Sequence, residues 1–142
     1  MDKMKFENHY MKQFDDELEE IRTRLMEMGG KVEQQLQNAI RAVSEADSSL
    51  ADEVIKEEKF VDEMEVDIDE ACILIIARRQ PAASDLRLVM MVTKAVNDLE
   101  RIGDEAKKIA KHAILLAGES ETSKGYTEVR HLGQSVVSML AN

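Results

Sequence analysis

Apolar residues recur in steps of three and four along most of this chain. The first series covers about eight helical turns and keeps one face of a helix apolar. Its members are Phe14, Leu18, Ile21, Leu25, Met28, Val32, Leu36, Ala39 and Val43. Good helix formers fill most positions between them, and the whole chain of 142 residues contains one proline and six glycines. The pattern predicts one long helix and leaves no segment typical of a β-strand.

Two further apolar series predict two more helices of similar length. The second helix begins after a turn in which Asp47 or Ser48 serves as the N-cap. The third begins at Pro81, because proline suits the first position of a helix and pushes the preceding residue out of helical geometry. The two series are Leu50, Val54, Val61, Met64, Ile68, Cys72 and Ile75, and then Leu88, Val92, Ala95, Leu99, Ile102, Ala106, Ile109, Ala113 and Leu116. Long helices joined by short turns predict an antiparallel bundle.

Two local features complete the expected fold. The adjacent Gly29 and Gly30 cost on the order of 2 kcal/mol of helix propensity, so we expect a bend or a close neighbour there. A polar connection after residue 118 leads to a fourth amphipathic helix that starts near Val129. We therefore expect an all-α fold, with an antiparallel three-helix bundle over residues 1–118 and a linker plus an incomplete helix over residues 119–142.

The charge balance restricts the classes of partner. Lys and Arg number 19 against 29 Asp and Glu, which gives a net charge of −10. Such an acidic chain repels phosphate backbones, so we expect no direct binding of nucleic acid. No segment is apolar enough to cross a bilayer, and the single Cys72 has no partner for a disulfide or a zinc site. We expect a cytoplasmic protein in which Cys72 is a small buried residue.

Acidic side chains concentrate in residues 52–70, which hold ten acids and two lysines. Each residue of an α-helix is rotated by about 100° from the one before it, which places four of these acids on one side of the helix, beside its apolar stripe. They are Glu58, Asp62, Glu65 and Asp69. Carboxylates on neighbouring helices are the oxygen ligands that hard cations prefer, and a bound cation would cancel their repulsion. The candidate metal ligands are Glu65, Asp69, Glu100 and Asp104, with Asp62 and Asp98 as further candidates.

The same acids also fit two other interpretations. They could form a solvated helix face, with Asp104 paired to Lys107 or Lys108. They could instead belong to a carboxylate-bridged metal enzyme, but such a site needs two Glu-x-x-His pairs, and the chain has one, Glu128 with His131. The helical wheel places Glu100 and Asp104 away from the apolar stripe, so we expect an open site on the outside of the bundle. Because the sequence lacks a catalytic motif, we expect no enzymatic activity.

The second predicted helix carries apolar residues on the side away from its main stripe. An additional apolar face usually packs against a further partner. This partner is either a second copy in a homodimer or a missing second half of the protein. The candidate partner-binding residues are Ile55, Val66, Ile73 and Arg101.

Three segments of the chain carry a resemblance to a known family: residues 28–30, residues 78–87 and residues 98–104. Through them nearly the whole chain resembles the amino-terminal half of the PhoU family. The resemblance implies two similar three-helix bundles, so that residues 119–142 would begin the second one. It also implies acidic E(D)-x-x-x-D motifs that hold metal ions such as Mg²⁺, Mn²⁺, Zn²⁺ or iron. The pairs Glu65 with Asp69 and Glu100 with Asp104 fit this motif.

The resemblance also implies a function. Proteins similar to this one repress phosphate uptake and the phosphate-starvation response when phosphate is plentiful. They act as adaptors between the ATP-binding subunit of the phosphate ABC transporter and its sensor histidine kinase, and reach the membrane only through these partners. The expected function is therefore a metal-binding, non-enzymatic regulator. The alternative is a structural helical interaction module without metal.

Overall fold

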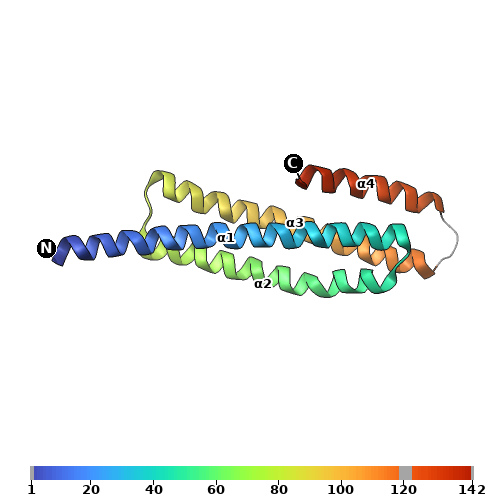
Figure 1. Cartoon of the computed structure of the whole chain (residues 1–142), viewed down its shortest axis with the longest axis horizontal. Coiled ribbons are helices and arrows are strands. Elements are labelled where there is room, and N and C mark those ends of the chain that lie inside the picture. Colours follow the sequence, from blue (N-terminus) through green and yellow to red (C-terminus); the bar gives the residue numbers. More distant parts are fainter. Residues whose placement is uncertain (1, 119–122, 142) are drawn as a thin grey trace.

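The computed structural model describes residues 2–118 and 123–141, with side chains given for residues 2–118 and 132–141. It contains four helices (Figure 1): α1 (Asp2–Glu45), α2 (Ser48–Arg79), α3 (Ala83–Gly118) and α4 (Ser123–Ala141). The described residues form no strand, so the expected all-α fold is confirmed. The linker residues 119–122 lie outside the described residues, and α4 begins earlier than the expected Val129.

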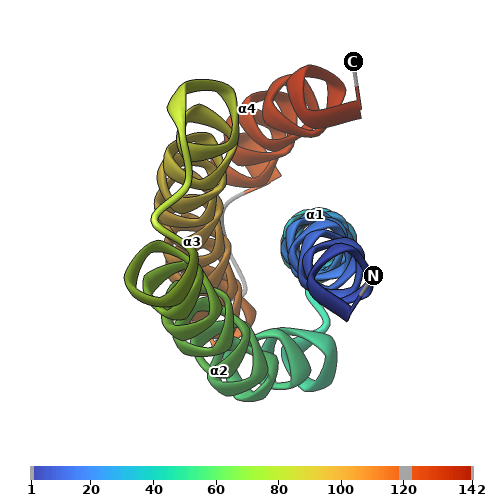
Figure 2. The same cartoon turned by 90° about the vertical axis from the view of Figure 1, so that its left-hand side faces the viewer.

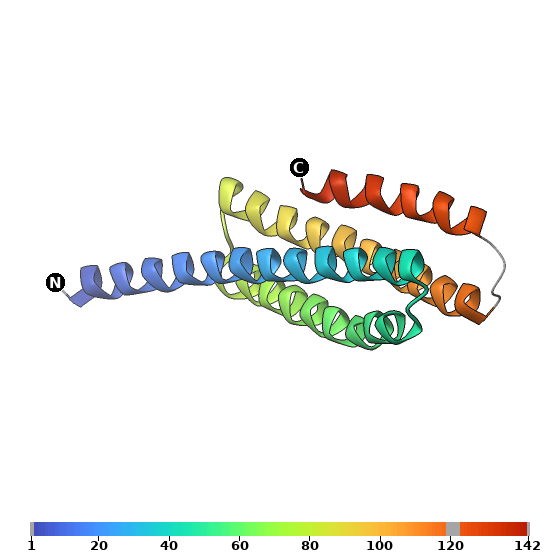
Figure 3. The same cartoon turned by 45° about the vertical axis from the view of Figure 1, so that its right-hand side comes forward.

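Helix α1 lies at the centre of the molecule. Viewed along the bundle axis (Figure 2), α2, α3 and α4 form an arc around it. Helix α1 packs against each of the other three helices, and α2 also packs against α3. Figures 1 and 3 show that consecutive helices run in opposite directions and that the first turns of α1 project beyond the ends of α2 and α3.

The short turns between the helices are set by local hydrogen bonds. Asp47 is the N-cap of α2, because its carboxylate accepts a hydrogen bond of 3.1 Å from the backbone N–H of Leu50. Helix α2 ends at Gln80, which takes the left-handed conformation with φ 45° and donates its N–H to the carbonyl of Ile76. The expected start of the third helix at Pro81 is wrong. The carbonyl of Ala82 accepts the first helical hydrogen bond, from Leu86, so proline precedes the cap.

The glycine pair in α1 has a simpler setting than expected. Helix α1 continues through Gly29 and Gly30 without interruption. A Cβ atom at Gly29 would make an ordinary contact of 4.0 Å with Leu99, and a Cβ at Gly30 would meet no atom within 4 Å. The expected close neighbour is therefore absent at both glycines.

The buried core consists of two apolar clusters that follow one another along the bundle axis. The first contains Leu18, Ile21, Met28, Val32, Val61, Ile68, Cys72, Ile75, Val89, Val92 and Val96. The second contains Leu36, Ala39, Ile40, Ala42, Val43, Ala51, Val54, Ala106, Ala110 and Ala113. Between them lie Gln35 of α1, Glu58 of α2 and Gly103 of α3, all buried. We call these three residues the polar layer.

Helix α3 approaches the core through smaller residues than the apolar series predicted. Its buried residues are Val89, Val92, Val96, Gly103, Ala106, Ala110 and Ala113. The larger Leu88, Leu99 and Ile102 are only partly buried beside them. Small side chains at the contact allow two helix backbones to approach closely, so the centre of the buried face is displaced from the larger residues.

The turn between α2 and α3 is fastened to α1 by Arg79. Its guanidinium donates two hydrogen bonds to the carboxylate of Glu17, with distances of 2.8 and 3.1 Å, and lies 4.6 Å from the ring centroid of Tyr10. The Arg79 side chain is only 11% exposed, so this ion pair is less screened than the surface pairs of the chain. It fixes the bundle end near the projecting part of α1.

Helix α4 packs on the second half of α1. Val136, Val137 and Leu140 contact the second apolar cluster. Gly133 is buried against Ile40, and a Cβ atom at Gly133 would overlap the Ile40 side chain. Glycine at this position thus sets how closely α4 approaches α1. No helix in the described part of the chain is both long and apolar enough to cross a membrane.

We expect Gly133→Ala and Gly30→Ala to change stability in opposite directions. Both remove a glycine from a helix interior, which favours the helix by about 0.5–1 kcal/mol. At Gly30 the new methyl group has open space, whereas at Gly133 it overlaps Ile40. Only Gly133→Ala should therefore loosen the packing of α4. Urea unfolding and hydrogen exchange of the α4 amides would measure this. Equal gains in both variants would contradict the packing of α4 described above.

Candidate metal centre

Three carboxylates converge where α2 meets α3 at the polar layer. One oxygen atom from each of Glu58, Asp62 and Glu100 lies within 4.8 Å of the others. Glu58 is buried, Glu100 is half-buried and Asp62 is exposed. We call this group the carboxylate cluster. It extends from the solvent into the core of the bundle.

Helix geometry explains why these residues meet. Glu58 and Asp62 are four residues apart, so their side chains lie one above the other on the same face of α2. Glu100 comes from α3, one turn before Gly103. A Cβ atom at Gly103 would lie only 3.2 Å from Oε2 of Glu58, which is tighter than an ordinary contact. Glycine at this position therefore leaves room for the Glu58 carboxylate between the two helices.

The inner end of the cluster is only partly hydrogen-bonded. Nε2 of Gln35 donates to Oε2 of Glu58 over 2.6 Å and to the carbonyl of Val54 over 3.3 Å. Oε1 of Glu58 and Oε1 of Gln35 are buried without a hydrogen-bond partner, and so is Oδ1 of Asp69 further along α2. A buried oxygen atom without a partner is costly, so the Glu58 carboxylate is suited to accept a proton or to bind a cation.

The surroundings raise the pKa of Glu58 to about 7. Burial is the largest cause, because it disfavours the charged carboxylate. The hydrogen bond from Gln35 acts in the opposite direction, and the negative charges of Asp62 and Asp104 raise the pKa further. At neutral pH, Glu58 is therefore close to half protonated when no cation is present.

Neighbouring acids share this perturbation. Burial and the charges of Asp69, Asp62 and Asp104 raise the pKa of Glu65, and burial and the charges of Asp104, Glu65 and Asp62 raise that of Glu100. Burial also raises the pKa of Asp69. These effects join the acids of α2 and α3 into one electrostatic unit around the carboxylate cluster.

The lysines of residues 2–118 form no ion pair with this unit. Lys108 pairs with Glu105 over 3.2 Å, and not with Asp104 as one interpretation of the sequence suggested. Among residues 2–118 and 132–141, no ion pair includes a member of the carboxylate cluster, Glu65, Asp69 or Asp104. The acidic unit therefore lacks an internal counter-charge in the described part of the chain.

The expected ligands lie at the surface of the bundle: Asp62 is exposed, and Glu65, Asp69, Glu100 and Asp104 are half-buried. Glu58, which was not among them, is only 3% exposed and reaches the core. Asp98 is exposed on α3 and lines a groove with Leu99 and Gly29, apart from the carboxylate cluster. The side chains of Glu128 and His131 lie outside the described residues.

Glu58 is the residue whose importance the apolar pattern did not reveal. Its sequence signal is a gap of seven residues between Val54 and Val61 in the apolar series of α2, with Glu58 at the intervening inward position. Gln35 and Gly103 occupy the corresponding level of α1 and α3. Only the packing of three helices shows that these polar and small residues face one another.

The candidate partner-binding residues fall into two groups. Ile55 is half-buried and packs against the second apolar cluster, so the chain itself already covers part of this side chain. Val66 and Ile73 are 53% and 64% exposed on α2, and Arg101 is exposed on α3. The outer face of α2 thus keeps an apolar surface that the described helices do not cover.

The fold and the carboxylate cluster define an all-helical bundle protein with a cluster of acidic side chains between two of its helices. The PhoU domain matches residues 25–113, more than half of the chain. The chain therefore belongs to the PhoU family, as the sequence motifs predicted.

Similar proteins agree with this assignment. The phosphate-specific transport system accessory protein PhoU homolog of Pseudomonas putida is 53% identical over 133 residues, which are 94% of this chain and 52% of that protein. The PhoU accessory protein of Escherichia coli K12 is 56% identical over 80% of this chain and 47% of its own length. The crystal structure of PhoU from Pseudomonas aeruginosa superimposes with a TM-score of 0.86 at 52% identity, covering 90% of this chain and 61% of that one. The chain spans about half the length of the curated relatives it matches.

We expect the metal-free chain to lose stability between pH 5 and pH 8, because Glu58 binds its proton more tightly in the folded state. The pKa of Glu58 is raised from 4.5 to about 7, so its tighter proton binding in the folded state contributes fully to the free energy of unfolding below pH 4.5. This contribution to stability is lost as the pH rises through 7. The loss is about 3 kcal/mol at most. Urea unfolding in the presence of EDTA would measure it.

Glu58→Gln should be less sensitive to pH and more stable than the unaltered chain at pH 8, because the amide carries no charge. Glu63→Gln is the matched control, since Glu63 is exposed on the same helix. If both variants retained the pH slope of the unaltered chain, the raised pKa of Glu58 would be rejected.

Proposed function

We propose that this chain is part of a negative regulator of phosphate uptake and of the phosphate-starvation response. It acts as a non-enzymatic, metal-binding adaptor in the cytoplasm. Membership of the PhoU family and the names of its relatives, which are accessory proteins of the phosphate-specific transport system, support the connection to phosphate transport.

The metal part of the proposal rests on one observation. Glu58 places a buried carboxylate oxygen without a hydrogen-bond partner beside Asp62 and Glu100, and no ion pair within residues 2–118 neutralises the three. A divalent cation would supply both the missing partner and the missing charge. The side chains of these three residues all offer carboxylate oxygens.

We propose Glu58, Asp62 and Glu100 as the inner ligands. Glu65, Asp69 and Asp104 extend the same acidic unit and would hold further metal ions or bridge them. Hard oxygen donors favour Mg²⁺, Mn²⁺ or iron, while Zn²⁺ more often takes nitrogen or sulfur ligands as well. Asp98 is not part of this proposal, because it lies apart from the cluster.

We propose two protein partners: the ATP-binding subunit of the phosphate ABC transporter and the sensor histidine kinase. The exposed Val66 and Ile73 on α2 and Arg101 on α3 support a role in protein contacts, either with these partners or with a second copy in a homodimer. The relatives are about twice as long as the matched region, which supports the proposal that residues 119–142 begin a second bundle.

Titration with Mg²⁺, Mn²⁺, Zn²⁺ and Fe²⁺ tests the metal site. We expect saturable binding by isothermal titration calorimetry and a melting temperature that rises with metal concentration, because a ligand that binds only the folded state stabilises it. Glu58→Gln and the double variant Glu100→Ala, Asp104→Ala should weaken binding by about tenfold or more.

The matched control for this titration is Asp16→Ala, Glu20→Ala, which removes two exposed acids with the same four-residue spacing from α1. It should leave binding and the metal-induced rise in melting temperature unchanged. A melting temperature indifferent to every metal would favour the structural module without metal.

The adaptor role is tested by binding assays with the purified transporter ATPase and the cytoplasmic part of the sensor kinase. We expect this chain to bind at least one of them, and Val66→Ser, Ile73→Ser to weaken that complex by about tenfold, since buried apolar contacts at an interface centre carry much of its affinity. A two-bundle relative serves as the positive control. Binding of neither partner by this chain, together with binding of both by the control, would reject an adaptor role for this half.

A further inference from the structure

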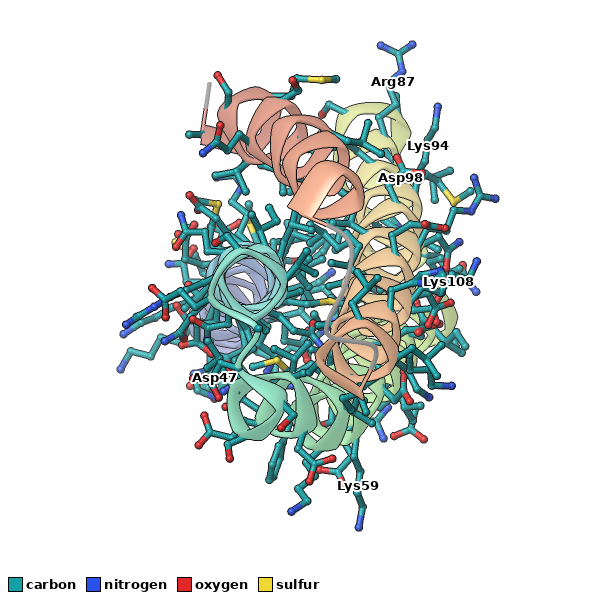
Figure 4. All side chains as sticks on the ribbon, turned by 90° about the vertical axis from the view of Figure 1, so that its right-hand side faces the viewer. Asp47, Lys59, Arg87, Lys94, Asp98 and Lys108 are labelled. Atoms are coloured by element: carbon teal, nitrogen blue, oxygen red, sulfur yellow. The ribbon has the colours of Figure 1, made fainter. Side chains whose placement is uncertain are left out.

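The outer face of α3 carries a regular row of cations. Arg87, Lys94, Arg101 and Lys108 are spaced seven residues apart, and all four are exposed. Seven residues are close to two helical turns, so the row stays on one side of the helix with a spacing of about 10 Å. Figure 4 shows that Arg87, Lys94 and Lys108 all point away from α1, on the outer side of α3.

Three of these cations are not used within the described chain. Lys108 forms an ion pair with Glu105. Arg87, Lys94 and Arg101 form no ion pair within residues 2–118 and 132–141, although Asp98 is four residues from Lys94. We call Arg87, Lys94 and Arg101 the cation row. The exposed Asp98 and Glu105 fall on the same line of α3, and Glu105 pairs with Lys108. The line keeps a net positive charge in a chain that is otherwise strongly acidic.

Apolar side chains lie beside the cation row. Met90 and Met91 are 55% and 58% exposed, and Leu86 is 37% exposed one turn earlier. Leu86 directly precedes Arg87 in the sequence, and the two methionines lie between Arg87 and Lys94. Cations therefore lie on both sides of the exposed methionines. Methionine is flexible and polarisable and is common at surfaces that bind partner helices.

We propose that this face of α3 binds an acidic amphipathic helix of a partner protein. The partner helix would lie along α3, with apolar side chains on Leu86, Met90 and Met91 and with Asp or Glu near the cation row every seven residues. This arrangement follows the pairing rules of coiled coils, in which apolar contacts supply affinity and flanking charges choose the partner. The proposal rests on the adaptor function above and does not involve the carboxylate cluster.

Two other occupants would use the same charges. The acids of α2 lie on the neighbouring helix and repel the extended anionic surface of a nucleic acid or a membrane more than a single acidic helix that lies along α3. A second copy could offer Glu63, Val66 and Glu70 from the outer face of its α2. A contact of α3 in one copy with α2 in the other can occur twice across a two-fold axis, so a symmetric dimer is the competing occupant that sedimentation separates from a partner helix.

The test uses a designed helical peptide of about three heptads, with Glu at every seventh position and Leu on the adjoining positions. Fluorescence anisotropy should detect its binding to the unaltered chain. A scrambled peptide of the same composition should bind at least about tenfold more weakly, because its acids and apolar residues no longer share a face. Higher salt should weaken the binding, since the paired charges are exposed.

The matched variants are Lys94→Glu, Arg101→Glu and Lys12→Glu, Lys59→Glu, which change the net charge equally. All four residues are exposed, and Figure 4 shows Lys59 pointing away from α3. We expect the first double variant to lose at least about tenfold in affinity and the second to retain it. Met90→Ser, Met91→Ser should weaken binding by a similar factor. Circular dichroism would verify that each variant is folded.

Four outcomes would overturn the proposal. They are equal binding of the designed and scrambled peptides, no binding of either, equal losses in the two charge-reversal variants, and self-association in sedimentation that Lys94→Glu, Arg101→Glu abolishes. The last would assign the face to a second copy. If the peptide assay fails while the transporter ATPase or the kinase still binds Lys94→Glu, Arg101→Glu, the adaptor function stands and only the role of this face is rejected.

Discussion

The hydrogen bond between Gln35 and Glu58 organises the centre of this molecule. It joins α1 to α2 inside the core and, with Gly103, separates the two apolar clusters. A fully apolar core would avoid a cost in stability, because a buried carboxylate with one unpartnered oxygen is unfavourable. The small residue at position 103 shows that α3 accommodates this carboxylate instead of covering it. The bundle is therefore assembled around a carboxylate with one oxygen that has no hydrogen-bond partner among the described residues.

That buried group connects the core to the acidic surface. The charges of Asp62 and Asp104 raise the pKa of Glu58, and those of Asp62, Asp104 and Glu65 raise that of Glu100, so protonation at one position is felt at the others. A cation bound here would act on the contact of α2 with α3 and, through Gln35, on α1. The outer face of α3 differs from this acidic region, because Arg87, Lys94 and Arg101 form no ion pair among residues 2–118 and 132–141 and lie near two exposed methionines. Helix α3 thus separates a cluster of carboxylates from a surface with exposed cations and apolar side chains.

The apolar spacing predicted the class, number and order of the helices, because a face that repeats every three or four residues can be buried only by a helix. Capping by Asp47 was among the two expected alternatives, since its short acidic side chain reaches a free N–H. The exact buried face of α3 was not predictable. Large residues such as Leu99 have the stronger apolar signal, yet Gly103 and Ala110, which the apolar series did not include, are buried and allow closer helix contact. Pro81 was misplaced for a related reason: its backbone suits a helix start, but the left-handed Gln80 leaves Ala82 as the cap.

By itself, the sequence determined an acidic, all-α chain of the PhoU family and named the helices whose carboxylates face one another. These properties depend on composition and on local periodicity, which a single helix expresses without its neighbours. Only the tertiary structure decided that Glu58 lies in the core, that Ile55 packs against the second apolar cluster and that Asp98 lies outside the carboxylate cluster. Burial and the distance between side chains on different helices depend on how the helices pack, and a helical wheel contains no information on the neighbour that each face meets.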